Sequence, residues 1–522
     1  MRISYCLILL TLHLGLSACA TLPTEVVRPG SDYRDRDGEP SRIADYAAPY
    51  HRQHKEKSGF RLLGDGLDAF AARVMLADAA DRTIDVQYYL YHDDLTGRLL
   101  TYRLLRAADR GVRVRLLLDD MATKGNDTAL ATLDAHPNIA VRIVNPFANR
   151  NLRGLETLAR FDTVTRRMHN KSFTVDNLMT IVGGRNIGDE YFGTHENVNF
   201  GDMDVLALGS TAAEVGHQFD LYWNSDLAYP VRALVERTDA LDALRRELKQ
   251  FNDAQVDSSY ARQARNSDVA LEFIEGKLDF HWGHALVFYD LPEKLTTDPE
   301  DRSTHLGPKV RARTFDVVQR DLLLFNPYFV PGDAGVALLK ALEERGVRVR
   351  LLTNSLASTD VGAVHAGYAK YRKPLLRGGV EIYEFKPDAE RADRRKFGKL
   401  AGSSGTSLHA KTGVFDQQAL YVGSSNLDPR SGKLNTELGI LFQSETLAKG
   451  LTDWFDTNKT RIAYQVTLDR THCADTPPCQ GRLRWIDDAD GREVVYLKDP
   501  ETGILTRFFV GLVGLLPIEG QL

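Results

Sequence analysis

The chain lacks the excess of basic residues that nucleic-acid-binding proteins usually carry. Its 522 residues include 66 Lys and Arg against 71 Asp and Glu, which gives a net charge of −5 at pH 7. Because proteins that neutralise many phosphates need a surplus of cations, we do not expect nucleic acid to be a partner. The length is too great for one simple core, and 43% hydrophobic residues is typical of a globular protein, so we expect two or more domains.

Cysteine is also scarce, with four residues in the whole chain. Cys6 lies within an expected leader, and Cys19 follows that leader. Cys473 and Cys479 remain, and the neighbouring His472 alone offers too few ligands for a metal site. In an oxidising compartment this pair favours a disulfide. We expect no metal and no cofactor.

No apolar run is long enough to span a bilayer as a permanent helix. The N-terminal stretch Leu7–Leu16 is short, and it leads into Leu16-Ser17-Ala18-Cys19. This ending resembles a bacterial lipobox, which implies that residues 1–18 are a lipoprotein signal peptide and that Cys19 is acylated. An ordinary signal peptide with an incidental cysteine is the alternative.

We expect the segment after the leader to be a lipidated tether. Residues 19–58 are polar and rich in charge, Gly and Pro. Acyl chains on Cys19 would hold the protein at a membrane. Ala20 lacks the Asp that marks inner-membrane retention. We therefore expect a lipid-anchored protein of the bacterial cell envelope that faces the periplasm, with the outer membrane favoured over the inner one.

One motif occurs twice, as His-x-Lys followed by four residues and Asp, with an Asn placed 17 residues after the His in both copies (169 to 186 and 409 to 426). The first copy consists of His169, Lys171, Asp176 and Asn186, and the second consists of His409, Lys411, Asp416 and Asn426. A nucleophile, a cation and a carboxylate in duplicate predict two half-sites that meet at one phosphodiester.

The surroundings of this motif repeat as well. The heptapeptide Gly111–Leu117 recurs letter for letter at Gly346–Leu352, and in each half it follows a strand-like and a helix-like segment. A strand, a helix and a strand in this order predict a βαβ unit. We therefore expect an α/β fold of two lobes related by internal repeat, each with a largely parallel sheet, that form one bilobal body with the active site between them.

The expected boundaries are a first lobe over 59–230, a helical linker or insert over 231–305, a second lobe over 306–470 and a C-terminal extension over 471–522. Within the extension, residues 504–516 are apolar at helical spacing and too few to span a membrane. This helix either lies in the membrane interface or packs on the body.

The residue types of the motif suit metal-free transfer at a phosphodiester. Such a reaction needs a nucleophile, a charge that neutralises the phosphoryl oxygens and an acid for the leaving oxygen. Histidine can attack or donate a proton near neutral pH, and lysine supplies a point charge. Asn186 and Asn426 add neutral donors for the same oxygens. Two copies fit a two-step displacement through a phosphohistidine.

Each reacting imidazole also needs a partner that sets its tautomer. The expected partners are Glu437 in the second half and Asp204, which holds the matching place in the first half. Asp176 and Asp416 end their strands. We expect these two to brace the lobes more than to touch substrate, although both stay in the predicted site.

The duplicated motif, together with Gly183–Asn186 and Gly423–Asn426, resembles the phospholipase D superfamily. Ile84–Tyr89, Arg167–Ser172 and Gly184–Asp189 are more closely similar to the cardiolipin synthase C-type phosphatidyltransferases. This resemblance runs from about residue 59 to the end of the chain. It implies two phospholipase D-like lobes and a phospholipase D-type enzyme.

The same resemblance implies a membrane-anchored phosphatidyltransferase that makes cardiolipin. Its phospholipid substrates would be a donor, phosphatidylglycerol or phosphatidylethanolamine, and phosphatidylglycerol as acceptor. By family analogy His169 attacks the phosphodiester, while His409 protonates the departing alcohol and deprotonates the incoming one. If water replaces the acceptor, the enzyme is a hydrolytic phospholipase D that releases phosphatidic acid. A phosphodiesterase acting on nucleic acid is a third reading, which the acidic net charge disfavours.

Overall fold

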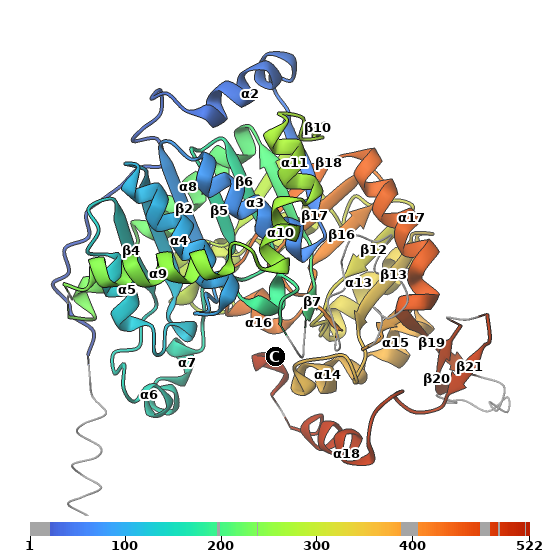
Figure 1. The fold of residues 1–522 in the computed structure, drawn as a ribbon. Coiled ribbons are helices and arrows are strands. Elements are labelled where there is room, and N and C mark those ends of the chain that lie inside the picture. The colour runs from blue at the N-terminus through green and yellow to red at the C-terminus, as the bar shows by residue number, and fades with distance from the viewer. Residues whose placement is uncertain are drawn as a thin grey trace, which may run out of the picture.

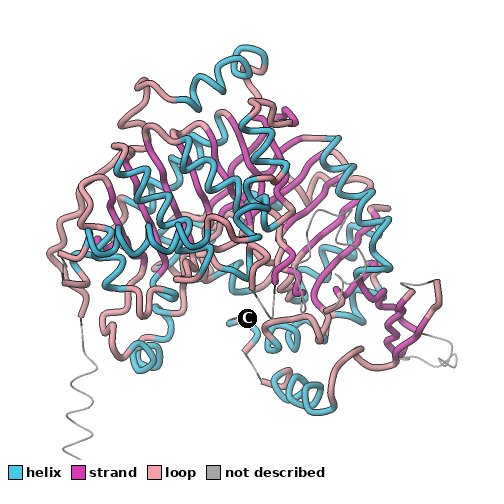
Figure 2. The backbone as a smooth tube through the Cα atoms, viewed as in Figure 1, coloured by secondary structure: helices cyan, strands magenta, loops and turns pink. Residues whose placement is uncertain are grey.

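The computed structural model describes residues 21–195, 199–236, 239–387, 406–469, 481–488, 491–516 and 518–522. Within this part of the chain two large sheets stand next to each other, each flanked by helices (Figures 1 and 2). The first sheet has nine strands in the order β10-β1-β8-β6-β5-β2-β3-β4-β9, and the second has ten in the order β11-β18-β17-β16-β12-β13-β14-β19-β20-β21.

The elements of the first lobe are strands β1 (Ser58–Leu63), β2 (Thr83–Tyr88), β3 (Arg113–Asp119), β4 (Ile139–Val144), β5 (Ser172–Val175), β6 (Met179–Gly183), β8 (Asp204–Leu208), β9 (Ala228–Pro230) and β10 (His281–Gly283), and helices α2 (Arg42–Gln53), α3 (Gly66–Ala79), α4 (Leu95–Asp109), α5 (Asp127–Leu133), α6 (Arg153–Ala159), α7 (Phe161–Val164), α8 (Ser210–Trp223), α9 (Leu241–Gln255), α10 (Ser259–Arg265) and α11 (Asp268–Ile274).

The elements of the second lobe are strands β11 (Ala285–Tyr289), β12 (Asp321–Phe325), β13 (Arg348–Asn354), β14 (Glu381–Phe385), β16 (Thr412–Phe415), β17 (Ala419–Gly423), β18 (Leu438–Gln443), β19 (Ala463–Asp469), β20 (Arg482–Asp487) and β21 (Val494–Tyr496), and helices α12 (Gly307–Arg313), α13 (Gly332–Glu344), α14 (Gly362–Ala369), α15 (Arg372–Arg377), α16 (Pro429–Lys433), α17 (Glu445–Ile462) and α18 (Ile504–Val513). Two further strands, β7 (Asn199–Gly201) and β15 (Thr406–Leu408), pair with each other across the lobes.

The internal repeat is visible in the strand order, which confirms the predicted pair of α/β lobes. The order β8-β6-β5-β2-β3-β4 of the first sheet matches β18-β17-β16-β12-β13-β14 of the second. The repeated heptapeptide supplies β3 and β13, each of which runs parallel to the strand before it. In both halves Gly closes the intervening helix with positive φ, at Gly111 and Gly346, a conformation that glycine adopts without steric cost.

The strands that follow His169 and His409 are antiparallel to their neighbours, so the expectation of largely parallel sheets is wrong for this half of each lobe. β5 and β16 run antiparallel to β2 and β12 and turn directly into β6 and β17. The turns contain Asp176-Asn177 and Asp416-Gln417, and all four residues have positive φ. Two successive residues with positive φ are typical of a type I′ hairpin turn, which reverses the chain.

Three predicted boundaries differ from the structure. The expected tether contains α2, whose Ile43 and Ala47 are buried in the core of the first lobe. The insert does contain helices α9, α10 and α11, but it ends in β10 and β11, which complete the edges of the two sheets. The C-terminal extension adds β20 and β21 to the second sheet. These added strands are short, at three to six residues each, and each is defined by pairing with a strand remote in the sequence.

The two lobes share a hydrophobic core. One cluster of buried residues includes Val182 and Val205 from the first sheet and Val422 and Ile440 from the second. The rings of Phe60 and Phe442 stack across the boundary with centroids 4.4 Å apart. The relative position of the lobes is therefore set by side-chain packing, which leaves little freedom at the interface.

The predicted acylation site Cys19 and the predicted disulfide between Cys473 and Cys479 lie outside the described residues. Among the helices that are described, none combines the length and the apolar character needed to cross a membrane.

Candidate active site

Both motif histidines are held at the interface by backbone bonds to the opposite lobe. The His169 N–H donates to the carbonyl of Thr436 at 2.9 Å, and the Thr436 N–H donates to the carbonyl of Arg167 at 3.0 Å. In the second lobe the N–H groups of His409 and Ala410 donate to the Gly201 carbonyl at 2.7 and 3.1 Å. The two motifs, 240 residues apart in sequence (169 to 409), thus meet at one junction.

Each imidazole is paired with a carboxylate from the other lobe. His169 Nδ1 lies 2.9 Å from Glu437 Oε2 and 3.1 Å from Oε1. His409 Nδ1 lies 2.6 Å from Asp202 Oδ2. All four side chains are buried. With Nδ1 bonded to a carboxylate, Nε2 is the ring nitrogen left for chemistry, and the carboxylate stabilises the imidazolium form.

The prediction that Asp204 orients an imidazole is wrong. Asp204 Oδ2 accepts a hydrogen bond from Arg73 Nη2 at 2.9 Å, within the interior of the first lobe. Asp204 is the first residue of β8, whereas Asp202 precedes the strand and faces the interface. Both acids occur in the segment that matches the surroundings of Glu437, and spacing could not choose between residues two apart. The sequence therefore indicated the right segment, but only the contact between Asp202 and His409 shows which of the two acids orients the imidazole.

The two motif lysines are buried beside the histidines. Lys171 Nζ donates to the His169 carbonyl at 2.8 Å, and Lys411 Nζ donates to the His409 carbonyl at 2.6 Å. Burial lowers the pKa of Lys171 to about 7 and that of Lys411 to about 8. The charge of Lys411 further lowers the pKa of Lys171, so the two cations act on one another across the interface. An anionic phosphodiester would relieve this repulsion.

Burial also sets the protonation state of the histidines. It is the largest cause that lowers the pKa of His169, and the cations Lys171 and Lys411 lower it further. Burial and Lys411 likewise lower the pKa of His409, although Asp202 opposes them. The His169 ring is therefore neutral at pH 7, with an unprotonated nitrogen that can attack phosphorus, whereas His409 has a carboxylate partner that stabilises its imidazolium when the ring carries a proton.

The two carboxylate partners differ in their surroundings. Burial raises the pKa of Glu437 to about 7, although Lys171 and two hydroxyl groups oppose this shift. Those hydroxyls belong to Ser424 and Ser431, which donate to Glu437 at 2.5 and 2.7 Å. For Asp202, burial is the largest cause and acts to raise the pKa, but His409, Lys411 and Arg185 together outweigh it and the pKa is lowered. Sequence reasoning missed both serines, since isolated hydroxyls give no pattern.

The two predicted asparagines lie beside the site with different partners. Asn186 Oδ1 accepts the Leu90 N–H at 3.1 Å, and its Nδ2 donates to the Tyr191 hydroxyl at 2.8 Å. The Tyr191 ring lies edge-on to His409 with centroids 5.4 Å apart, so Asn186 positions an aromatic wall. Asn426 Oδ1 is buried without a hydrogen-bond partner in the described residues.

Asp176 and Asp416 lie away from the imidazoles and hold the hairpin turns to the neighbouring chain. Asp176 accepts the backbone N–H groups of Arg82 and Thr83 at 2.9 Å each, and the hydroxyl of Ser41 at 2.6 Å. Asp416 accepts three successive backbone N–H groups of residues 319–321. Both therefore brace their lobes, as expected for residues that end a strand.

Aromatic rings that sequence reasoning did not select surround the histidines. The ring centroids of Tyr89 and His169 are 5.1 Å apart, and those of Tyr328 and His409 are 6.1 Å apart. The Tyr328 hydroxyl donates to Asp360 Oδ2 at 2.6 Å, and this exposed carboxylate counteracts the lowering of the pKa of Lys411. These rings pack against the two imidazoles and form an aromatic surround on both sides of the interface.

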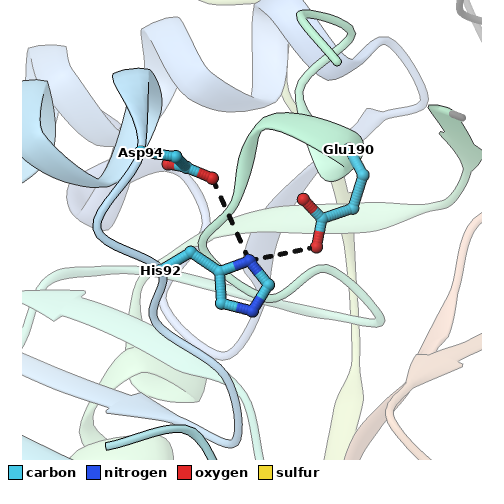
Figure 3. Close-up of side chains that lie close together, drawn as sticks. All are labelled: His92, Asp94 and Glu190. Carbon is cyan, nitrogen blue, oxygen red and sulfur yellow. Dashed lines mark ion pairs between the residues drawn. The ribbon is translucent and has the colours of Figure 1, made fainter. Parts of the chain in front are cut away.

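One cluster near the site has the residue types of a metal site. His92 Nδ1 lies 3.3 Å from Glu190 Oε1 and 3.9 Å from Asp94 Oδ2 (Figure 3). The hydrogen bond with Glu190 raises the pKa of His92. Asp94 meanwhile caps α4 through the Gly97 N–H, so it already has a structural role. The cluster therefore works as an ion pair that ties the start of α4 to the segment after Asn186.

This fold and site define an enzyme of the phospholipase D class, in which two histidine–lysine half-sites meet between two α/β lobes. Residues 74–223 and 313–459 match the family described as "Cardiolipin synthase, PLD-like domain". The chain belongs to this family and is a phospholipase D-type phosphatidyltransferase.

Individual relatives agree with this assignment. The chain is 42% identical to cardiolipin synthase C of Escherichia coli (strain K12) over 92% of its own length and 99% of that protein. It is 26% identical to cardiolipin synthase A of Pseudomonas putida (strain GB-1) over 74% and 66% of the two lengths. The crystal structure of phosphatidylserine synthase from Haemophilus influenzae Rd KW20 has the same fold, with a TM-score of 0.52 at 13% identity, and the match covers 79% of this chain and 90% of that one.

Proposed function

We propose that the protein is a cardiolipin synthase that transfers a phosphatidyl group to phosphatidylglycerol through a phosphohistidine. The observation that carries this proposal is the pair of buried imidazoles, each held through Nδ1 by a carboxylate of the opposite lobe. Two such groups supply the nucleophile and the proton carrier that a double displacement needs. The relationship to cardiolipin synthase C of Escherichia coli supports the choice of substrate.

In the first step, His169 Nε2 attacks the phosphorus of the donor phospholipid. The bond from phosphorus to the headgroup oxygen breaks, and His409, which enters this step as the imidazolium paired with Asp202, delivers its Nε2 proton to that oxygen. In the second step, His409 takes the proton from a hydroxyl of phosphatidylglycerol, whose oxygen attacks phosphorus and releases His169. Lys171 and Lys411 neutralise the charge that builds on the phosphoryl oxygens in both steps.

The preference for a lipid alcohol over water is part of this proposal. His169 and His409 are largely buried, and aromatic rings lie against both. A site that excludes bulk water protects the phosphohistidine from hydrolysis. Hydrolytic release of phosphatidic acid is the alternative outcome of the same chemistry.

A lipid-product assay tests the proposal. Purified protein is incubated with phosphatidylglycerol vesicles, with and without phosphatidylethanolamine, and the products are separated by mass. Cardiolipin with release of glycerol or ethanolamine is the expected result, and the released alcohol identifies the donor. His169→Ala and His409→Ala should each abolish product, whereas His217→Ala, an exposed histidine on α8, should not. Phosphatidic acid as the sole product would reassign the enzyme as a hydrolase.

We also propose that Cys19 carries lipid and places the enzyme in the cell envelope, facing the periplasm. The support is the Leu-Ser-Ala-Cys sequence at residues 16–19 and the phospholipid substrates. Metabolic labelling with a tagged fatty acid should mark the wild type and not Cys19→Ser. Labelling of both proteins, or of neither, would contradict this anchor.

A further inference from the structure

The C-terminal helix presents an unusual apolar surface. Helix α18 has no buried residue. Seven large apolar side chains of α18 and the turn after it have exposed fractions between 51% and 82%, namely Ile504, Leu505, Phe508, Phe509, Leu512, Leu515 and Leu516. Arg507 is the single charged residue between 504 and 516. Soluble surfaces rarely expose contiguous apolar groups of this extent without a partner.

This surface is held in place by contacts of α18 itself and of the segment after it. Within α18, Arg507 Nη1 donates to the Thr502 carbonyl at 2.6 Å, and the side chain of Val510 approaches α14 at Gly362. After it, Glu519 pairs with Lys370 and accepts a hydrogen bond from the Tyr371 hydroxyl. The exposed helix is therefore a fixed part of the second lobe.

The chain beyond α18 leads directly to the active site. The carbonyl of Leu522 accepts the Arg430 N–H at 2.9 Å, on helix α16. The next residue, Ser431, donates to Glu437, the partner of His169. The charge of Arg430 also contributes to the lowered pKa of His169. The apolar surface is thus tied to the reacting groups through one short helix.

The first lobe has apolar residues on the same side of the molecule. Helices α6 and α7 project on the side where α18 and the C-terminus lie (Figure 1). Leu152, at the start of α6, and Phe161, at the start of α7, are each 45% exposed. A partner that met all of these residues would have to be broad and flat, because they belong to both lobes.

We propose that α18 inserts into the interfacial layer of a phospholipid bilayer and holds the active-site side of the enzyme against it. The inference rests on the proposed function, because a lipid-transferring site must receive its substrate from a bilayer. An amphipathic helix with one cation and exposed Phe and Leu residues binds a bilayer by burying its apolar face at the acyl boundary. This attachment is separate from the acyl chains expected at Cys19 and, unlike them, fixes the orientation of the enzyme.

Site-specific photocrosslinking tests this contact without requiring turnover. The photoreactive residue p-benzoylphenylalanine replaces Phe509 in the full-length protein, which is reconstituted in vesicles of equal parts phosphatidylglycerol and phosphatidylethanolamine. The matched control carries it in place of Ile274, which is 77% exposed on α11. Crosslinks to lipid are expected from position 509 and not from 274. A protein dimer crosslinked through 509, or equal labelling at both positions, would overturn the proposal.

A second measurement separates docking from chemistry. Phe508→Ser combined with Phe509→Ser should lower activity on these vesicles at least about tenfold, since two large apolar groups are lost from the contact. Activity on soluble dihexanoyl phosphatidylglycerol should stay within about twofold, and Ile274→Ser should change neither activity. Equal losses on both substrates would overturn the docking role. Wild-type protein that is inactive on both substrates would instead count against the proposed function.

Discussion

Replacing Asp202 by Asn tests whether His409 depends on a carboxylate from the opposite lobe. Asp202 Oδ1 accepts the Met203 N–H at 2.7 Å, while Oδ2 faces His409 Nδ1 at 2.6 Å. An Asn here keeps its oxygen on the Met203 N–H and turns its amide group toward Nδ1. A donor facing Nδ1 forces the ring proton onto Nε2. Nε2 can then no longer take the proton of the acceptor alcohol.

The size of the loss follows from the same contact. A hydrogen bond to a charged group contributes roughly 1.5–3 kcal/mol. Two unit charges about 4 Å apart interact by about 4 kcal/mol at an effective dielectric constant near 20. The two figures describe overlapping effects, so we take about 3–4 kcal/mol as the lost stabilisation of the His409 imidazolium. This corresponds to a decrease in kcat of about 100- to 1000-fold.

The assay is single-turnover formation of cardiolipin from labelled phosphatidylglycerol, with thermal unfolding measured on each variant. Asp204→Asn is the comparison, because it lies two residues away and bonds Arg73 instead of a histidine. That variant should be less stable, yet keep kcat within about tenfold per folded molecule. The reasoning is refuted if Asp202→Asn retains more than a tenth of the wild-type kcat, or if Asp204→Asn loses more activity than Asp202→Asn.

Three further predictions concern the same machinery. The value of kcat/KM should fall below about pH 7 as Glu437 gains a proton, and it should fall above about pH 7 as Lys171 loses one and above about pH 8 as Lys411 does. A flat profile from pH 6 to pH 9 would contradict this, and the acidic limb should be absent from the residual activity of Glu437→Gln. Asp416→Ala should lower the free energy of unfolding by about 2–3 kcal/mol, because backbone N–H groups lose their acceptor. The value of kcat per folded molecule should change less than twofold. Chemical denaturation and turnover assays check both, and a large loss of kcat with unchanged stability would show that Asp416 acts in catalysis. A labelled phosphoryl group trapped by rapid quench should map to His169 in the wild type and be absent from His169→Ala. It should form more slowly in His409→Ala, which lacks the acid for the leaving oxygen, and a label on His409 in the wild type would reverse their roles.

Local sequence already contained the parts of the fold that depend on short-range chemistry. The repeated heptapeptide gave β3 and β13, and Gly111 and Gly346 close the preceding helices because glycine tolerates positive φ. The duplicated motif located both histidines and both lysines. The role expected of Asp176 and Asp416 also agrees with the contacts, since a carboxylate at a hairpin turn finds backbone donors nearby.

Contacts between distant segments could not be read in this way. The choice of Asp202 over Asp204 depends on which residue faces the other lobe, and the two are only two positions apart, one before β8 and one at its start. Ser424 and Ser431 became relevant only when the fold brought them to Glu437. The edge strands β10 and β11 looked like an insert because pairing with a remote strand, and not their own pattern, makes them strands.

The sequence by itself determined that this protein carries two histidine–lysine half-sites on two similar α/β units, because motif spacing and hydrophobic pattern are properties of neighbouring residues. Only the tertiary structure decided that each histidine takes its carboxylate from the opposite unit and that α18 keeps its apolar face uncovered. The physical reason is that a hydrogen bond across an interface and the exposure of a helix depend on how whole lobes pack, and that packing is the sum of many contacts between residues far apart in the chain.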